Sequence, residues 1–136
     1  MVKKAQVGIE YMIVISFVTF AVMSVLVIAM FYSDKIKDRI KLNQVESFFT
    51  QLLNSAESVF FSGEPSKTSI SLFLPAGIGE ITIYDEYILV VTSTSSGDNR
   101  EIFRSDVPIQ GTISITEGTK KLVLTAYENY LDISEA

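Results

Sequence analysis

The chain contains no cysteine and no histidine among its 136 residues. Without cysteine it can form no disulfide, no thiolate metal site and no cysteine nucleophile. Without histidine it lacks the commonest general base and the commonest metal ligand. Any stability that the protein has outside a cell must therefore come from packing or from neighbouring subunits.

Basic charge is also scarce. Lysine and arginine number 11 against 16 aspartates and glutamates, which gives a formal net charge of −5. An acidic chain repels nucleic-acid phosphates, and no basic stripe offsets this repulsion. We therefore expect no nucleic-acid partner.

The sequence offers little that could support catalysis. The acidic neighbours Asp85 and Glu86 would point to opposite faces of a strand or be solvated in a turn. The serine- and threonine-rich run at residues 92–96 has no histidine to activate a nucleophile, and it is typical of a loop or an O-glycosylation patch. No glycine-rich phosphate-binding loop is present. We expect no enzymatic activity, no catalytic residue, no cofactor and no metal site.

The most distinctive feature is an uncharged apolar run at residues 11–32, in which the only polar side chains besides the two terminal tyrosines are Ser16, Thr19 and Ser24. As a helix this run would span about 33 Å, which matches a hydrocarbon core of about 30 Å. Lys3 and Lys4 precede the run and favour a cytoplasmic N-terminus with the remainder outside. The basic residues between positions 35 and 41 weaken this expected orientation.

Three interpretations of the run compete: a secretory signal peptide, a plain transmembrane anchor, or a helix that also packs against other subunits. Glu10 favours the third. A carboxylate at the edge of an apolar helix is costly in hydrocarbon, and a plain anchor has no use for it. A cut between Ala5 and Gln6 would create an amino group at Gln6. Glu10 could then pair with that amino group on a neighbouring subunit, where either charge alone would be costly.

Residues 3–10, Lys-Lys-Ala-Gln-Val-Gly-Ile-Glu, followed directly by the apolar run, resemble the class III signal peptide of archaeal type IV pilins. In that family a basic leader is cut before a glutamine, and a glutamate stands at the fifth position of the mature chain. By this resemblance Lys3 and Lys4 are leader charges, Ala5 and Gln6 flank the scissile bond, and Gln6 and Glu10 take part in subunit assembly. Position 8 is glycine where the family often has serine.

The resemblance implies a structural subunit of an adhesive surface filament that polymerises through its N-terminal helix. Its partners would be identical subunits in a helical filament, a class III prepilin peptidase, an assembly ATPase and a membrane platform protein. The precursor would lie in the membrane and the assembled form outside the cell. Two alternatives remain: a membrane-anchored accessory protein that does not polymerise, and a tethered domain that binds a sugar or another ligand through its tyrosines.

The helical pattern continues beyond the apolar run. From Ile36 to Phe60 apolar residues recur mostly at steps of three and four, and the sequence Ser-Gly-Glu-Pro at residues 62–65 supplies a stop signal. We expect one helix from about Gln6 to about Phe61, with the face from Val45 to Phe60 packed on the C-terminal region.

After the proline at position 65 the period changes to two. Alternating or β-branched runs begin near Ser69, Ile81, Glu86, Ile113, Leu122 and Asn129, and turn residues separate them. The expected fold class is α+β, with a long N-terminal hydrophobic helix and a small antiparallel β-sheet or sandwich. The expected organisation is a leader at 1–5, a transmembrane or filament-core helix at 6–33, an amphipathic extension at 34–62 and a β-rich outer domain at 66–136.

Overall fold

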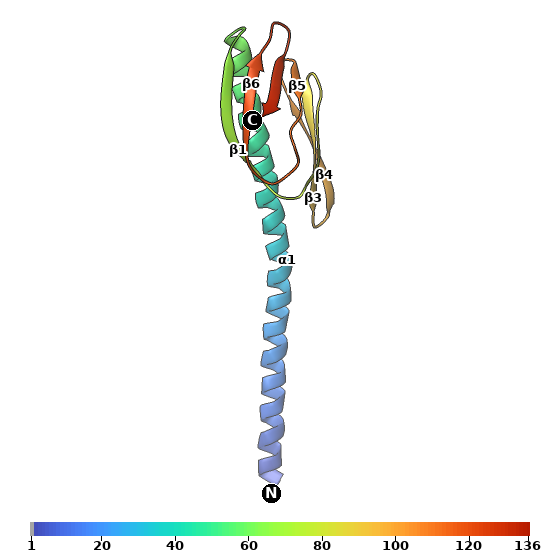
Figure 1. Cartoon of the computed structure of the whole chain (residues 1–136). Coiled ribbons are helices and arrows are strands. Elements are labelled where there is room, and N and C mark those ends of the chain that lie inside the picture. Colours follow the sequence, from blue (N-terminus) through green and yellow to red (C-terminus); the bar gives the residue numbers. More distant parts are fainter. Residues whose placement is uncertain (1) are drawn as a thin grey trace. The chain divides into compact units, whose positions relative to one another are not determined.

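The computed structural model describes residues 2–136, so Met1, the first residue of the expected leader, lies outside the described part. One long helix, α1 (Val2–Phe61), precedes all the strands (Figure 1). The strands are β1 (Lys67–Leu74), β2 (Ile78–Ile83), β3 (Tyr87–Thr94), β4 (Gly97–Arg104), β5 (Ile109–Gly111), β6 (Gly118–Ala126) and β7 (Leu131–Glu135). The expected α+β class, with a long apolar helix first, is confirmed.

The chain divides into two units, Met1–Lys37 and Asp38–Ala136. The described part of the first unit is helix alone, and its apolar side chains lie on every side of that helix. The second unit combines the remainder of α1 with all the strands. Helix α1 ends where the stop signal predicts, at Phe61, and Gly63 follows with a φ of 84°, a left-handed conformation that favours glycine.

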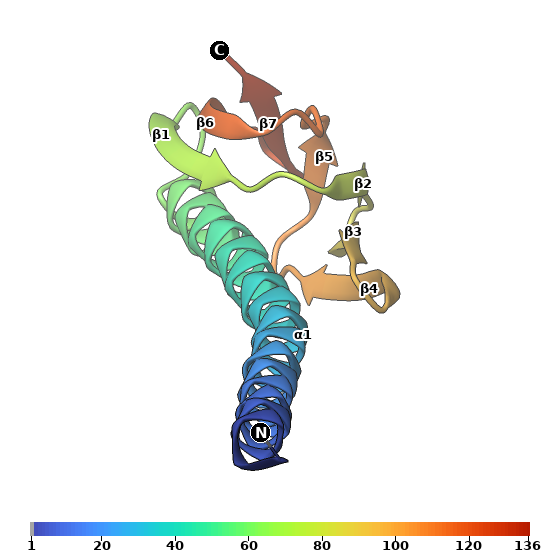
Figure 2. The same ribbon diagram turned by 90° about the horizontal axis from the view of Figure 1, so that it is seen from below.

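The strands of the second unit form two sheets, with orders β1-β6-β7-β5 and β2-β3-β4 (Figure 2). Neighbouring strands are antiparallel except for β5 and β7, which pair in parallel through Ile109 and Leu131. The antiparallel arrangement expected from the sequence therefore holds for the other four pairings. The two-residue hairpin expected at Asp85 and Glu86 is also present, because the Tyr84 amide donates to the Tyr87 carbonyl at 2.8 Å.

The core of the second unit lies between α1 and the inner faces of the sheets. Strand residues such as Ile88, Leu122 and Ile133 are fully buried in it. The side chains that the helix contributes share the three- and four-residue spacing read from the sequence: Val45, Phe48, Phe49, Leu52, Leu53, Ala56 and Val59. This periodic face removes the apolar surface of both partners from water, which is the main stabilising contribution in a small β-domain.

Two sequence-based expectations about strands were wrong. Strand β4 was not expected, because its sequence is polar and charged; it forms at the edge of its sheet, where charged side chains face water. Conversely, the residues around Ile113 and Ile115 form no strand. The Ser114 amide there bonds to the Glu135 carboxylate at 2.7 Å instead of to a neighbouring strand.

The run at residues 92–96, expected to be a loop, lies mainly in strand. Thr92 to Thr94 belong to β3, and only Ser95 and Ser96 form the turn to β4. β-Branched threonine suits the half-buried face of a strand, and this preference outweighs the loop-like composition of the run.

Candidate functional site on the N-terminal helix

The first unit presents an uncharged apolar surface along residues 11–32 of α1. The large apolar side chains of this stretch are between 50% and 73% exposed. Among the described residues, α1 is the one helix long and apolar enough to cross a membrane, and its most apolar window has a mean hydropathy of 2.7 with no buried residue. A surface of this size and composition favours lipid or other apolar helices over water.

Two of the hydroxyl groups within this stretch, those of Thr19 and Ser24, bond to the helix backbone. Thr19 Oγ1 donates to the Ile15 carbonyl at 2.8 Å, and Ser24 Oγ donates to the Phe20 carbonyl at the same distance. Each of these two hydroxyl protons thus has a partner one turn earlier in the helix. Because an unsatisfied donor is costly in an apolar medium, these bonds suit the stretch to a water-free environment.

The residues singled out from the sequence all lie in the first turns of α1. Lys3, Lys4, Ala5, Gln6 and Glu10 are helical and exposed. None of the charged residues in this group forms an ion pair within the described chain. Ala5 and Gln6 are both exposed residues, and the bond between them lies within the helix.

Gln6 and Glu10 are four residues apart, so their side chains share one face of the helix. Their separation along the axis is about 6 Å, at about 1.5 Å per residue. If the chain began at Gln6, a neighbouring parallel helix displaced by about 6 Å would bring its amino group level with Glu10. The geometry thus permits an intermolecular pair without bending the helix.

A separate cluster fastens the start of the second unit to the β3–β4 turn. Asp38 accepts hydrogen bonds from the Ser95 hydroxyl and from the Ser95 amide, the latter at 3.1 Å, and Lys41 Nζ donates to the Ser93 carbonyl at 3.0 Å. The Ser95 hydroxyl is the main cause that lowers the pKa of Asp38 below its ordinary value. Gly77 lies against Lys41 with a φ of 87°, and a Cβ there would come within 2.8 Å of the lysine Nζ.

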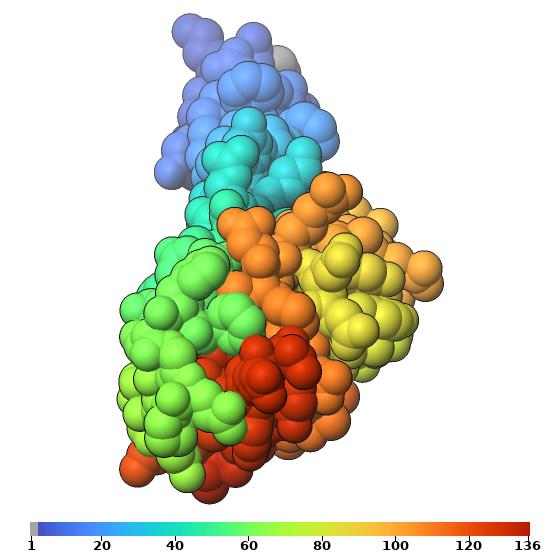
Figure 3. Space-filling view, turned by 90° about the horizontal axis from the view of Figure 1, so that it is seen from above, coloured from blue at the N-terminus to red at the C-terminus, as the bar shows by residue number. Residues whose placement is uncertain are grey.

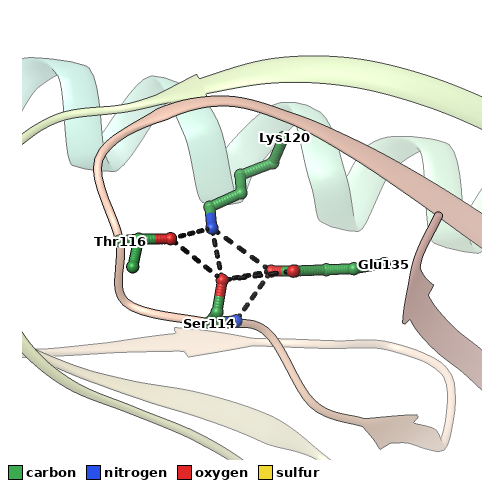
Figure 4. A network of polar contacts seen from close by, with 4 residues as sticks. All are labelled: Ser114, Thr116, Lys120 and Glu135. Atoms are coloured by element: carbon green, nitrogen blue, oxygen red, sulfur yellow. Dashed lines mark hydrogen bonds and ion pairs between the residues drawn. The ribbon is translucent and has the colours of Figure 1, made fainter.

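A second polar cluster closes the C-terminal strand against the irregular segment before β6 (Figure 4). Lys120, nine-tenths buried, forms an ion pair with Glu135 at 3.5 Å and bonds to the hydroxyls of Ser114 and Thr116. Hydrogen bonds from the Ser114 hydroxyl and amide, with the Lys120 charge, lower the pKa of Glu135 below its ordinary value. Every polar group here has a partner, so the cluster is structural.

Neither polar cluster was foreseen from the sequence. Each joins residues far apart in the chain, 57 positions apart for Asp38 and Ser95 and 21 for Ser114 and Glu135, and no local pattern marks them. Among residues 2–136 no group of acidic side chains is arranged to hold a metal ion.

Comparison with known proteins found no matching family model, no matching curated protein and no matching solved structure. Among the surfaces of the described residues, the exposed apolar helix with Glu10 at its edge is the most unusual.

Proposed function

We propose that this chain is a structural subunit of an archaeal type IV pilus, a surface filament that serves adhesion. The observation that carries the proposal is the combination of a long, exposed, uncharged helical surface with a single carboxylate, Glu10, where that surface begins. A membrane anchor alone accounts for the apolar surface but not for the acidic residue.

The proposed sequence of events begins in the membrane. The precursor inserts through the apolar helix, with Lys3 and Lys4 holding its N-terminus on the cytoplasmic side. A class III prepilin peptidase then cuts between Ala5 and Gln6. An assembly ATPase and a membrane platform protein transfer the mature subunit into a filament, and the β-rich unit remains outside the cell.

In the filament the apolar helix exchanges lipid for identical helices. Apolar contact by itself gains little over lipid, so close packing and polar pairing must favour the exchange. A shallow, wholly apolar hollow at Ala21, Val22, Val25 and Leu26 offers a place for a side chain of a neighbouring helix. The pair between Glu10 and a new amino group at Gln6 neutralises both charges and penalises any register that leaves either one alone.

Mass spectrometry of the protein in sheared filament fractions tests this function. The expected result is a mature N-terminus at Gln6 and enrichment of the protein in filaments. A membrane-bound protein that retains residues 1–5 and is absent from filaments would contradict the proposal, and it would favour a membrane-anchored accessory protein that does not polymerise.

A further inference from the structure

The second unit carries a hollow beside the β2–β3 turn. The hollow has a volume of about 480 Å³. Six residues line it: Glu86, Tyr87, Ile102, Arg104, Ser105 and Asp106. Ile102 is 60% exposed, although its neighbour Phe103 in β4 packs toward the core. The hollow therefore offers an apolar wall to a partner and two carboxylates at its rim.

The end of the unit that bears the hollow is built from two matching turns. Tyr84 stacks on Tyr87 with ring centroids 4.6 Å apart, and Tyr127 stacks on Tyr130 at 4.9 Å. Each pair closes a tight turn that contains an acidic residue, through a tyrosine amide-to-carbonyl bond of 2.8 Å.

The segment around Ile109 links the two turns. The Ile109 amide donates to the Asp85 carbonyl at 2.9 Å, and the Leu131 amide donates to the Pro108 carbonyl at 2.8 Å. In Figure 3 this orange segment lies between the yellow strands that carry the first turn and the red segment that carries the second. The two turns therefore share one end of the unit.

The carboxylates at this end are not neutralised within the chain. Among the described residues the one ion pair joins Lys120 and Glu135. Glu86 and Asp106 therefore have no ion-pair partner, although Arg104 lines the same hollow. The rim of the hollow is thus net acidic and suits a cationic partner with an apolar stem, since such a stem can lie against Tyr87 and Ile102.

Residues 35–40 of α1, called the basic segment below, combine exposed apolar side chains with cations and thus complement the hollow. Ile36 and Ile40 lie one turn apart on one face and are 55% and 51% exposed. Lys37 and Arg39 flank that face, are exposed and form no ion pair within the described chain. This segment therefore presents two apolar side chains between two cations.

Within the second unit, the hollow and Asp38 lie at opposite ends of β3. Tyr87 is the first residue of this eight-residue strand, and Ser95, which bonds to Asp38 within the basic segment, follows its last residue. Eight strand residues span about 26 Å, so Arg39 and Ile40, which follow Asp38 in the second unit, cannot reach the hollow of the same chain. These two side chains can meet the hollow only in another copy.

We propose that residues 35–40 of one copy dock in the hollow of the next copy, with Ile36 and Ile40 against Tyr87 and Ile102. Lys37 and Arg39 then face Glu86 and Asp106. The inference rests on the proposed filament function. Because it joins two different surfaces, the contact is head-to-tail and extends into an open array rather than closing a dimer. Charge complementarity of this kind fixes partner and register.

Charge reversal with compensation tests the contact in the full-length protein. We expect the pair Glu86→Lys and Asp106→Lys to lower the yield of sheared filaments at least about tenfold, and the pair Lys37→Glu and Arg39→Glu to do the same, since like charges would then face each other. A chain with all four substitutions restores complementarity and should recover filaments to within about twofold of wild type.

The matched control reverses two exposed acids away from the hollow, Glu80→Lys and Glu117→Lys, and should leave the yield unchanged. Cellular protein level and protease resistance of the β-rich unit establish that each variant is folded. If the variant with Glu86→Lys and Asp106→Lys does not fold, the variant with Glu86→Gln and Asp106→Asn takes its place, and we expect it to lose less of the filament yield.

The outcomes separate this contact from its alternatives. If the variant with all four substitutions gives as low a filament yield as the variant with Lys37→Glu and Arg39→Glu, the proposed contact is wrong. The cations then serve another partner, such as anionic lipid headgroups. Unchanged yields in both reversals also overturn it. In either case wild-type filaments that begin at Gln6 leave the proposed function standing, whereas wild-type protein absent from filaments overturns both proposals.

Discussion

Replacement of Phe49 by alanine probes the packing between α1 and the sheets. The Phe49 side chain is fully buried, with its ring edge-to-face against Phe48 at 4.9 Å and stacked on Phe103 of β4 at 5.0 Å. It therefore joins the helix to an edge strand that few other apolar residues hold in place. Phe49→Ala removes both aromatic contacts and leaves a cavity where they met.

The expected cost is large for a unit of this size. Phenylalanine-to-alanine substitutions in cores cost about 3–5 kcal/mol, which is a major fraction of the 5–15 kcal/mol that stabilises a typical domain. For a domain of about 100 residues, each 1 kcal/mol lowers Tm by about 4–8 °C. We therefore expect Phe49→Ala to lower the Tm of the second unit by about 20 °C and to open β4 to protease.

Thermal melting of the full chain in detergent, followed by near-ultraviolet circular dichroism, measures this change. The matched control is Phe61→Ala, at the end of the same helix, where the ring is 73% exposed; its Tm should stay within about 3 °C of wild type. Equal melting of Phe49→Ala and wild type, or an equal loss in both variants, would refute the packing described here.

Two further predictions concern β7 and its neighbours. Gly111→Ala should lower Tm by at least about 10 °C, because Gly111 has a φ of 132° and an added Cβ would overlap a backbone carbonyl of β7. The control is Gly79→Ala, whose Cβ would meet its nearest atom at 3.7 Å and which should change Tm by less than about 4 °C. Similar losses of Tm in the two variants would contradict this prediction. The lowered pKa of Glu135 means that its carboxylate contributes stability above the ordinary pKa of an unfolded glutamate and loses it as pH falls through the lower folded pKa. Urea unfolding should therefore show wild type more stable than Glu135→Gln at pH 6, with the difference shrinking below about pH 4; a constant difference across this range would be inconsistent with the charge-assisted bonds.

The fold class was predictable because its signals are local. The uncharged run, the three- and four-residue spacing from Ile36 onward and the glycine-proline stop together define α1 to within one residue of its observed end at Phe61. The switch to alternating residues after position 65 likewise predicts strands.

The errors came from strands that lack a local signal. Strand β4 forms because β3 offers it eight consecutive partners, from Tyr87 with Arg104 to Thr94 with Gly97, and this non-local pairing overrides its charged sequence. The strand predicted from the alternating isoleucines at 113 and 115 is absent for the opposite reason. The amide of Ser114 between them bonds to the Glu135 carboxylate instead of to a neighbouring strand.

The surfaces proposed to be functional also differ in whether local sequence predicts them. Glu10 and its neighbours are consecutive in the chain, so their shared helix face followed from the sequence. The hollow beside Tyr87 combines residues from the β2–β3 turn with residues of β4 and the segment after it, and only the folded sheet brings them together.

The most direct test of the central claim is the filament yield of Glu10→Gln compared with Asp34→Asn, another exposed acid, at the other end of the apolar run. If Glu10 neutralises the amino group of a neighbouring subunit, Glu10→Gln should lower the yield of sheared filaments at least about tenfold while Asp34→Asn leaves it unchanged. Filaments of Glu10→Gln at wild-type yield would contradict the account.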